Sequence, residues 1–128
     1  MTISNWFFRL GVIAALIGMT LGVWMGKAGD FTLSPVHAHI NLLGWVSMLL
    51  YGLFYRAFPV AAATKLAAAH FWINVLGVIV MVASLALYLS GHTQAAPILG
   101  VSGIIVALSM VIFAVIVFRA TGSKTQAA

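Results

Sequence analysis

Hydrophobic residues along the chain form four long runs, separated by short polar segments. A helix needs about 20 mostly apolar residues to cross about 30 Å of hydrocarbon, and each run is of that order. The pattern therefore predicts an all-α integral membrane protein. One four-helix transmembrane bundle would occupy residues 1–119, followed by a short tail of small and polar residues at 120–128. The predicted spans are residues 10–26, 35–58, 66–90 and 96–118.

The second run has the clearest boundaries. Ser34 is expected to cap the free N–H groups, Pro35 suits the first helical position, and Phe58-Pro59 ends the run. The first run lies where a signal peptide would lie. No cleavage pattern follows it, however, and the segment 24–27, Trp-Met-Gly-Lys, is typical of an interfacial helix end. We therefore interpret it as a spanning helix.

The composition excludes a soluble globular domain. Of the 128 residues, 64% are hydrophobic and only 5% are charged, whereas soluble domains have about a quarter charged residues. The absence of cysteine excludes c-type haem attachment, iron–sulfur clusters, thiolate copper sites and disulfides. The net charge of +5 is spread singly between apolar runs, so a nucleic-acid partner is not expected.

The basic residues instead predict the orientation, because cytoplasmic loops collect Lys and Arg. Most of them fall on one side of the membrane, whereas Lys27, beside Asp30, falls on the other. Both termini are therefore expected in the cytoplasm, in a multi-pass protein of a bacterial-type inner membrane. The residues on the cytoplasmic side are Arg9, Arg56, Lys65, Arg119 and Lys124.

Small residues recur at helical spacing in the first and fourth runs. In lipid, helices associate through close packing, which small residues permit. These positions are therefore expected to be helix contacts. They are Gly18, Gly22 and Gly26 in the first run, and Gly100, Gly103 and Ala107 in the fourth.

Two histidines, His37 and His39, lie one turn inside the outer end of the second run. Helical residues two apart point about 200° away from each other, so both rings cannot bind one metal ion. Either they bind two different metal centres, or one of them has another role. The alternative is two interfacial histidines bonded to loop carbonyls or water. Asn41 and Gly44 share the face of His37, where Asn41 could pair with a neighbouring helix and Gly44 would leave space for a flat macrocycle.

The other histidines lie at different depths. His70 is offset from His37 by roughly 20 to 25 Å along the helix axes. It is predicted to be a packing or hydrogen-bonding residue near the inner side, with a separate inner haem as the alternative. His92 lies in a polar outer turn and is expected to be solvated. The alternative is that it assists His37, which lies at the same depth. Trp24 and Lys27, at the outer end of the first helix, are placed either to meet haem propionates or to anchor the helix at the interface.

These residues carry a resemblance to a known family. The segments 36–46 and 51–56 resemble ligand-bearing helices of the catalytic subunit of haem-copper oxidases and nitric oxide reductases. They are also similar to helices of NnrS-like membrane haem proteins. The segment 70–72, followed by Gly77, is similar to the next helix of those proteins. The resemblance covers about half of the chain.

The resemblance implies a plan of twelve helices, in three arcs of four, with metal ligands on the second helix of each arc. In one such helix, two histidines spaced like His37 and His39 bind two different haems. The present chain would be one arc, so a symmetric homo-oligomer is expected, with a trimer favoured over a dimer. No helix here is similar to the family's copper-ligand helix, and no copper is expected.

The sequence thus predicts a membrane protein that binds haem b through bis-histidine iron and transfers electrons or has a related redox role. The expected metal ligands are His37 and His39, with Asn41, Gly44, Trp24 and Lys27 also contacting the cofactor. Filled axial positions favour electron transfer over a complete oxidase or reductase, and no catalytic residue is predicted. Two alternatives stay open: haem-dependent O₂ or NO binding or reduction at an open axial site, and a haem-free accessory or assembly subunit.

Overall fold

The computed structural model describes residues 1–122, and almost all of this part of the chain is helical. Four stretches are long and apolar enough to cross a membrane, as the sequence predicts. The second of them is continuous but contains a π-helical segment. The elements are α1 (Ile3–Ala28), α2 (Ser34–His39), the π-helix η1 (Ile40–Val46), α3 (Ser47–Ala57), α4 (Pro59–Ala62), α5 (Lys65–Leu89), the 3₁₀ turn η2 (Thr93–Ala95) and α6 (Ala96–Gly122).

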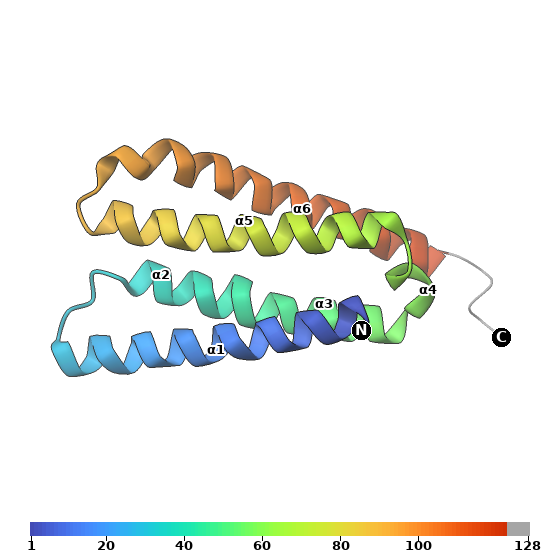
Figure 1. Cartoon of the computed structure of the whole chain (residues 1–128), viewed down its shortest axis with the longest axis horizontal. Coiled ribbons are helices and arrows are strands. Elements are labelled where there is room, and N and C mark those ends of the chain that lie inside the picture. Colours follow the sequence, from blue (N-terminus) through green and yellow to red (C-terminus); the bar gives the residue numbers. More distant parts are fainter. Residues whose placement is uncertain (123–128) are drawn as a thin grey trace.

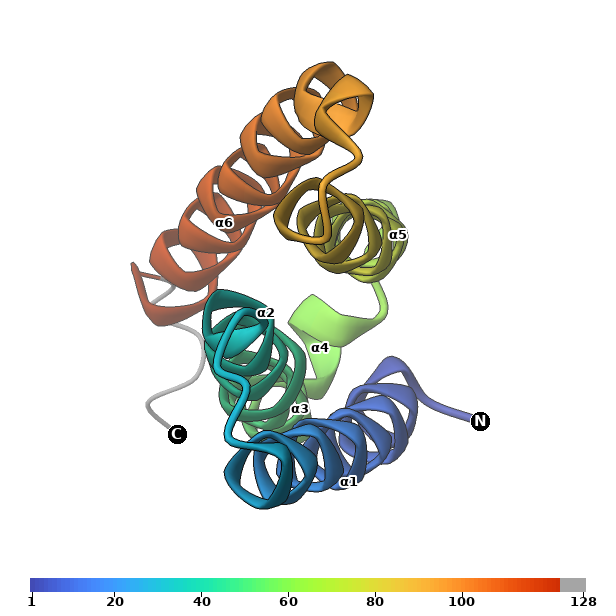
Figure 2. The ribbon, with the colours of Figure 1, turned by 90° about the vertical axis from the view of Figure 1, so that its left-hand side faces the viewer.

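The bundle consists of two antiparallel hairpins (Figure 1). One hairpin pairs α1 with the composite helix α2–η1–α3, and the other pairs α5 with α6. Seen along the bundle axis, the two hairpins lie side by side (Figure 2). We call the end with α4 and the start of α1 the inner end, and the end with loops 29–33 and 90–92 the outer end. Among the described residues, the basic side chains other than Lys27 therefore lie toward the inner end: Arg9, Arg56, Lys65 and Arg119. The cytoplasmic location of that end stays a prediction.

Several boundaries differ from the sequence-based expectation. α1 begins at Ile3, well before residue 10, because the Thr2 side chain caps it by accepting from the main-chain N–H of Asn5. The exposed Arg9 does not interrupt the helix. Ser34 is not the cap of the second helix: Leu33 occupies that position and no side chain bonds there. α6 continues to Gly122, so residues 120–122 of the predicted tail are helical. The rest of that tail, and Lys124, lie outside the described residues.

The π-helix η1 was not predicted. Its bonds run from residue i+5 back to residue i: the main-chain N–H of Ser47 donates to the carbonyl of Leu42. The Ser47 hydroxyl donates to the same oxygen at 2.7 Å. Such wide turns are rare in proteins overall, but those that occur are often found at functional sites. This one begins immediately after His39.

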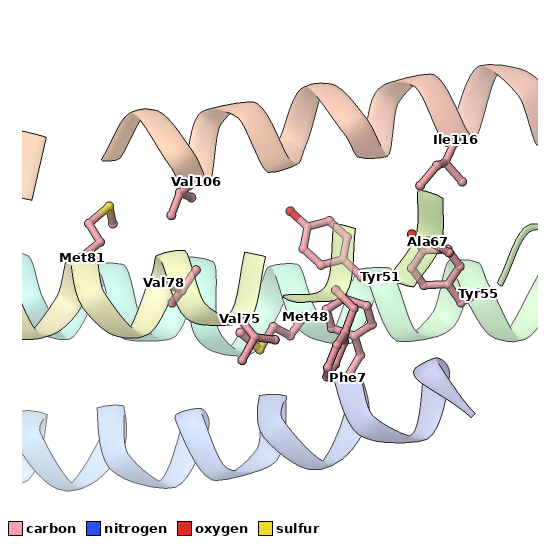
Figure 3. Packing of buried hydrophobic residues seen from close by; sticks show 11 residues of the cluster. Phe7, Met48, Tyr51, Tyr55, Ala67, Val75, Val78, Met81, Val106 and Ile116 are labelled. Atoms are coloured by element: carbon pink, nitrogen blue, oxygen red, sulfur yellow. The ribbon is translucent and has the colours of Figure 1, made fainter. Parts of the chain in front are cut away.

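Aromatic side chains join the two hairpins toward the inner end. Phe7 of α1 is fully buried, and its ring lies 5.4 Å from Tyr51, 5.8 Å from Tyr55 and 5.0 Å from Phe71 of α5. Figure 3 shows Phe7, Tyr51 and Tyr55 gathered between the helices. Tyr51 also packs against Phe113 of α6, at 4.6 Å between ring centres. This cluster is therefore a contact shared by all four long helices.

The predicted small-residue contacts are only half correct. Gly18 and Gly22 lie against the second helix, but Gly26 has no atom within 4 Å of where a Cβ would be. On α6, Gly103 contacts α5, since the sulfur of Met81 lies 3.9 Å from where its Cβ would be, but Gly100 has no such neighbour and Ala107 is exposed. The buried side chains of α6 are instead Ser102, Val106, Ser109, Ile116 and Ala120. A different face of α6 thus packs on α5.

Candidate functional site

The His37 ring lies between α2 and α1, at the outer half of the bundle. A Cβ at Gly22 would lie 2.8 Å from the ring carbon Cε1, so the ring occupies space that only glycine leaves open. The ring nitrogen Nδ1 lies 2.7 Å from the main-chain oxygen of Gly18. Gly18 and Gly22, one turn apart on α1, therefore form the surface that receives His37.

This contact determines which ring nitrogen of His37 carries hydrogen. A carbonyl oxygen only accepts, so Nδ1–H of His37 donates to Gly18. In the neutral ring, Nε2 is then left with its lone pair. The Asn41 nitrogen Nδ2 lies 3.3 Å from the same Nδ1, but two donors do not bond to each other. That nitrogen instead donates to the main-chain oxygen of His37, at 2.8 Å.

The His39 ring repeats this arrangement on the opposite flank of the helix. Its Nδ1 lies 2.6 Å from the main-chain oxygen of Pro35, one turn earlier. The same reasoning makes Nδ1–H the donor and leaves Nε2 with a lone pair. Because α2 is α-helical through both histidines, their side chains point in opposed directions. Both residues are half-buried.

The other predicted cofactor contacts are placed less favourably. Gly44 does not offer open space, because a Cβ there would lie 2.9 Å from the Ala14 Cβ of α1. The macrocycle space expected at Gly44 is thus filled by α1. Asn41 rests on Gly18 and bonds within its own helix instead of pairing with a neighbouring one. Trp24 and Lys27 are exposed at the outer end of α1.

His37 and His39 point in opposed directions from α2, so the described part of the chain does not bring their two rings to one point. Within residues 1–122, no three side chains of the His, Cys, Asp and Glu types lie close enough together to hold a metal ion. His92 is exposed, as expected, in the turn that leads into η2. One metal ion held by both a His37 and a His39 ring would therefore need two chains.

A second polar centre lies toward the inner end, around His70 of α5. The ring is fully buried, and Nδ1 lies 2.9 Å from the Tyr55 hydroxyl oxygen. The rings of Phe7, Tyr51 and Phe113 pack around it at 5.6, 4.7 and 5.1 Å between centres. His70 is thus a packing and hydrogen-bonding residue, as the sequence predicts. This tight enclosure does not support the alternative of an inner haem.

The two histidine levels are well separated along the bundle. His37 meets α1 at Gly18 and Gly22, whereas His70 meets it at Phe7. At 1.5 Å per residue, these α1 positions differ by roughly 17 to 22 Å. The structure therefore contains two distinct polar levels. The sequence signal for the inner one was the pair His70 and Asn74, polar residues one turn apart in an otherwise apolar helix.

Comparisons with protein-family models, curated proteins and solved structures give no match to this chain.

Proposed function

We propose that this protein is a membrane haem b-binding protein in which His37 and His39 are axial ligands to iron. Its role is then electron transfer or a related redox function, in a cytoplasmic membrane with both termini inside. The proposal rests on the resemblance of residues 36–56 to ligand-bearing helices, and on the state of the two rings.

The observation that carries the proposal is the hydrogen bonding of both Nδ1 atoms. Each Nδ1–H donates to a main-chain carbonyl, of Gly18 for His37 and of Pro35 for His39. Metal-binding histidines usually donate their second ring N–H in this way, which orients the ring and raises its basicity. Both rings thus have Nδ1–H bonded to a carbonyl and a lone pair on Nε2. Histidines that served only for packing would not need this shared arrangement.

The donor set fits haem iron, since haem b has no covalent attachment and needs only axial ligands, for which neutral imidazole is suitable. When bound, the haem would supply the one-electron chemistry. The protein would supply two oriented Nε2 lone pairs and an apolar surrounding. Trp24 and Lys27 would be placed at the outer interface to meet the propionates. Gly44 would not contact the haem, because Ala14 of α1 fills the space beside it.

The opposed directions of the two rings require a partner chain. One iron would be held by His37 of one protomer and His39 of the next. This pairing is head-to-tail, and such contacts close into rings. The three arcs of the resembling family favour a ring of three.

The test is an absorption spectrum of the protein purified from cells supplied with haem. We expect sharp reduced bands that do not change on adding carbon monoxide, the behaviour of six-coordinate iron. His37→Ala and His39→Ala should each abolish this signal or convert it to a five-coordinate form. His92→Ala is the matched control, because His92 is exposed at the outer end and should leave the spectrum unchanged.

The same spectrum separates the competing functions. A shift on adding carbon monoxide would indicate an open axial site and favour O₂ or NO binding. The absence of any visible band, in a folded protein, would favour a haem-free accessory subunit. An unchanged spectrum in either His37→Ala or His39→Ala would remove that residue as a ligand.

A further inference from the structure

The His70 centre contains two buried polar atoms without a protein partner. Among the described residues, Nε2 of His70 and Oδ1 of Asn74 are the buried side-chain nitrogen and oxygen atoms that make no hydrogen bond. His70 is fully buried and Asn74 is 2% exposed. An unsatisfied buried polar group is destabilising, and lipid offers no hydrogen bonds in exchange. The two atoms belong to residues one turn apart on α5, and residues four apart share one face of a helix.

The orientation of the Asn74 amide follows from its neighbour on α6. The Ser109 hydroxyl donates to the main-chain oxygen of Val106 at 2.7 Å, so its single hydrogen is used. The Ser109 oxygen is then an acceptor, and it receives Nδ2–H of Asn74 at 3.0 Å. Flipping the amide would set two acceptors against each other. Oδ1 of Asn74 is therefore an acceptor that needs a donor.

The position of the hydrogen on the His70 ring depends on the direction of its bond to Tyr55. The Tyr55 hydroxyl makes one hydrogen bond, to Nδ1 of His70. When Tyr55 donates, its own hydrogen is satisfied and the ring hydrogen lies on Nε2. Nε2–H of His70 is then a donor that needs an acceptor. The same face of α5 then has one unsatisfied donor and one unsatisfied acceptor. A molecule that accepts one hydrogen bond and donates another can satisfy both.

A pocket at the inner end, with both apolar and polar lining residues, borders this centre. It has a volume of about 360 Å³, and its lining includes Thr2, Ser4, Arg56 and Tyr55. Tyr55 thus lines the pocket, and its hydroxyl bonds to His70. Tyr55 therefore connects the polar groups of the inner-end pocket with the buried His70.

We propose that one internal water molecule binds between Nε2 of His70 and Oδ1 of Asn74, and that it exchanges with solvent through the inner-end pocket beside Tyr55. The water accepts from His70 and donates to Asn74. A hydrogen-bonded chain then runs from Tyr55 through His70, the water and Asn74 to Ser109, linking three helices. This site is independent of the haem proposal, because it lies at the other level of the bundle.

The test is proton-detected solid-state NMR of the full chain in phosphatidylcholine bilayers, with ¹⁵N-labelled histidine. Each of the four histidines is assigned by its own single substitution. We expect a ring N–H signal of His70 at Nε2, with a cross-peak to water protons. A soluble gadolinium chelate should broaden His92, which is exposed, and leave the His70 signal sharp. A His70 Nε2–H without a water cross-peak would overturn the proposal, as would a signal broadened like that of His92.

The variant Asn74→Leu supplies a second measurement. It removes the acceptor on which the water depends, so the His70 cross-peak to water should be lost. Ser84→Ala is the matched control, since Ser84 is a buried polar residue of the same helix whose hydroxyl bonds only to its own helix, at Val80 and Met81. Retention of the cross-peak in Asn74→Leu would also contradict the proposal. If that variant does not fold, the wild-type spectrum still decides.

Discussion

At the scale of single residues, the absence of a side chain at Gly22 decides the position of His37. A methyl group there would lie 2.8 Å from Cε1, well inside van der Waals contact, so the ring would have to move. The ring is held by its bond to Gly18 at 2.7 Å, and movement would weaken that bond. Gly26, one turn further, has no neighbour within 4 Å and provides a matched control.

We predict opposite effects for Gly22→Ala and Gly26→Ala. Ala in place of an unhindered helical Gly stabilises by about 0.5–1 kcal/mol, so Gly26→Ala should raise the thermal midpoint in detergent. Gly22→Ala should lower it or leave it unchanged, because the hydrogen bond it disturbs contributes about 0.5–1.5 kcal/mol. Circular dichroism measures the stability, and the ¹⁵N shift of the His37 ring should change only in Gly22→Ala. Equal shifts in both variants would contradict this account.

A second residue-scale prediction concerns Asp30, the only carboxylic side chain in the sequence. The Thr32 hydroxyl and main-chain N–H both donate to it, at 2.6 and 3.0 Å, and together they lower its pKa below the usual 3.8. Thr32→Val removes the stronger of these effects, so the pKa of Asp30 should rise toward its usual value. Because there is one such residue, ¹³C-aspartate labelling gives a single titrating signal.

The sign of the accompanying stability change follows from the lowered pKa. The two bonds favour the ionised carboxylate, so their contribution is present near neutral pH and is lost as the pH falls below about 4. Because Asp30 is fully exposed, the effect on stability should be small. Thr20→Val, whose hydroxyl bonds to Leu16 within α1, should leave the pKa of Asp30 unchanged.

At the scale of helices, the aromatic cluster toward the inner end joins the two hairpins. Phe7 is fully buried and contacts rings of α3 and α5. Truncating a buried Phe costs about 3–5 kcal/mol in soluble cores. In lipid, the separated helices do not expose the ring to water, and the cost should be smaller, on the order of 2 kcal/mol.

We therefore predict that Phe7→Ala destabilises the bundle strongly, whereas Trp6→Ala has little effect on helix packing. Trp6 is the next residue along α1 and is 45% exposed. Unfolding by increasing sodium dodecyl sulfate in mixed micelles, followed by circular dichroism, measures both variants. Similar losses in the two would show that the cluster does not join the hairpins.

At the scale of the whole molecule, the opposed directions of the His37 and His39 rings lead to a prediction about how the chains assemble. In the proposed head-to-tail pairing, each iron takes His37 from one chain and His39 from the next. Native mass spectrometry should then give three chains with three haems. A twofold dimer would pair like with like and give one haem for two chains. A monomer with full six-coordinate haem would refute the shared site.

Mixing two defective chains distinguishes these assemblies more sharply. His37→Ala retains His39, and His39→Ala retains His37. In the head-to-tail ring, co-expression of the two variants should rebuild some complete sites, so a six-coordinate spectrum absent from either variant alone should return. In a like-with-like dimer, mixed pairs lack a complete site and nothing new should appear.

Much of the architecture could be predicted from the sequence because it depends on local quantities. The four spans follow from apolar run length. Successive helices run in opposite directions, so the sequence also predicts that Arg9, Arg56, Lys65 and Arg119 share one end of the bundle. The opposed directions of His37 and His39 follow from helical geometry. These properties need no knowledge of which helix lies beside which.

The tertiary structure decided the features that depend on contacts between distant residues. Which small residues are in contact was settled by helix pairing: Gly18 and Gly22 receive the second helix, while Gly100 faces open space. Ala14 fills the space at Gly44, and Ser109 of α6 leaves Asn74 with an unsatisfied acceptor. Helical periodicity specifies which residues share a face. What lies against that face depends on packing between segments that are far apart in the chain.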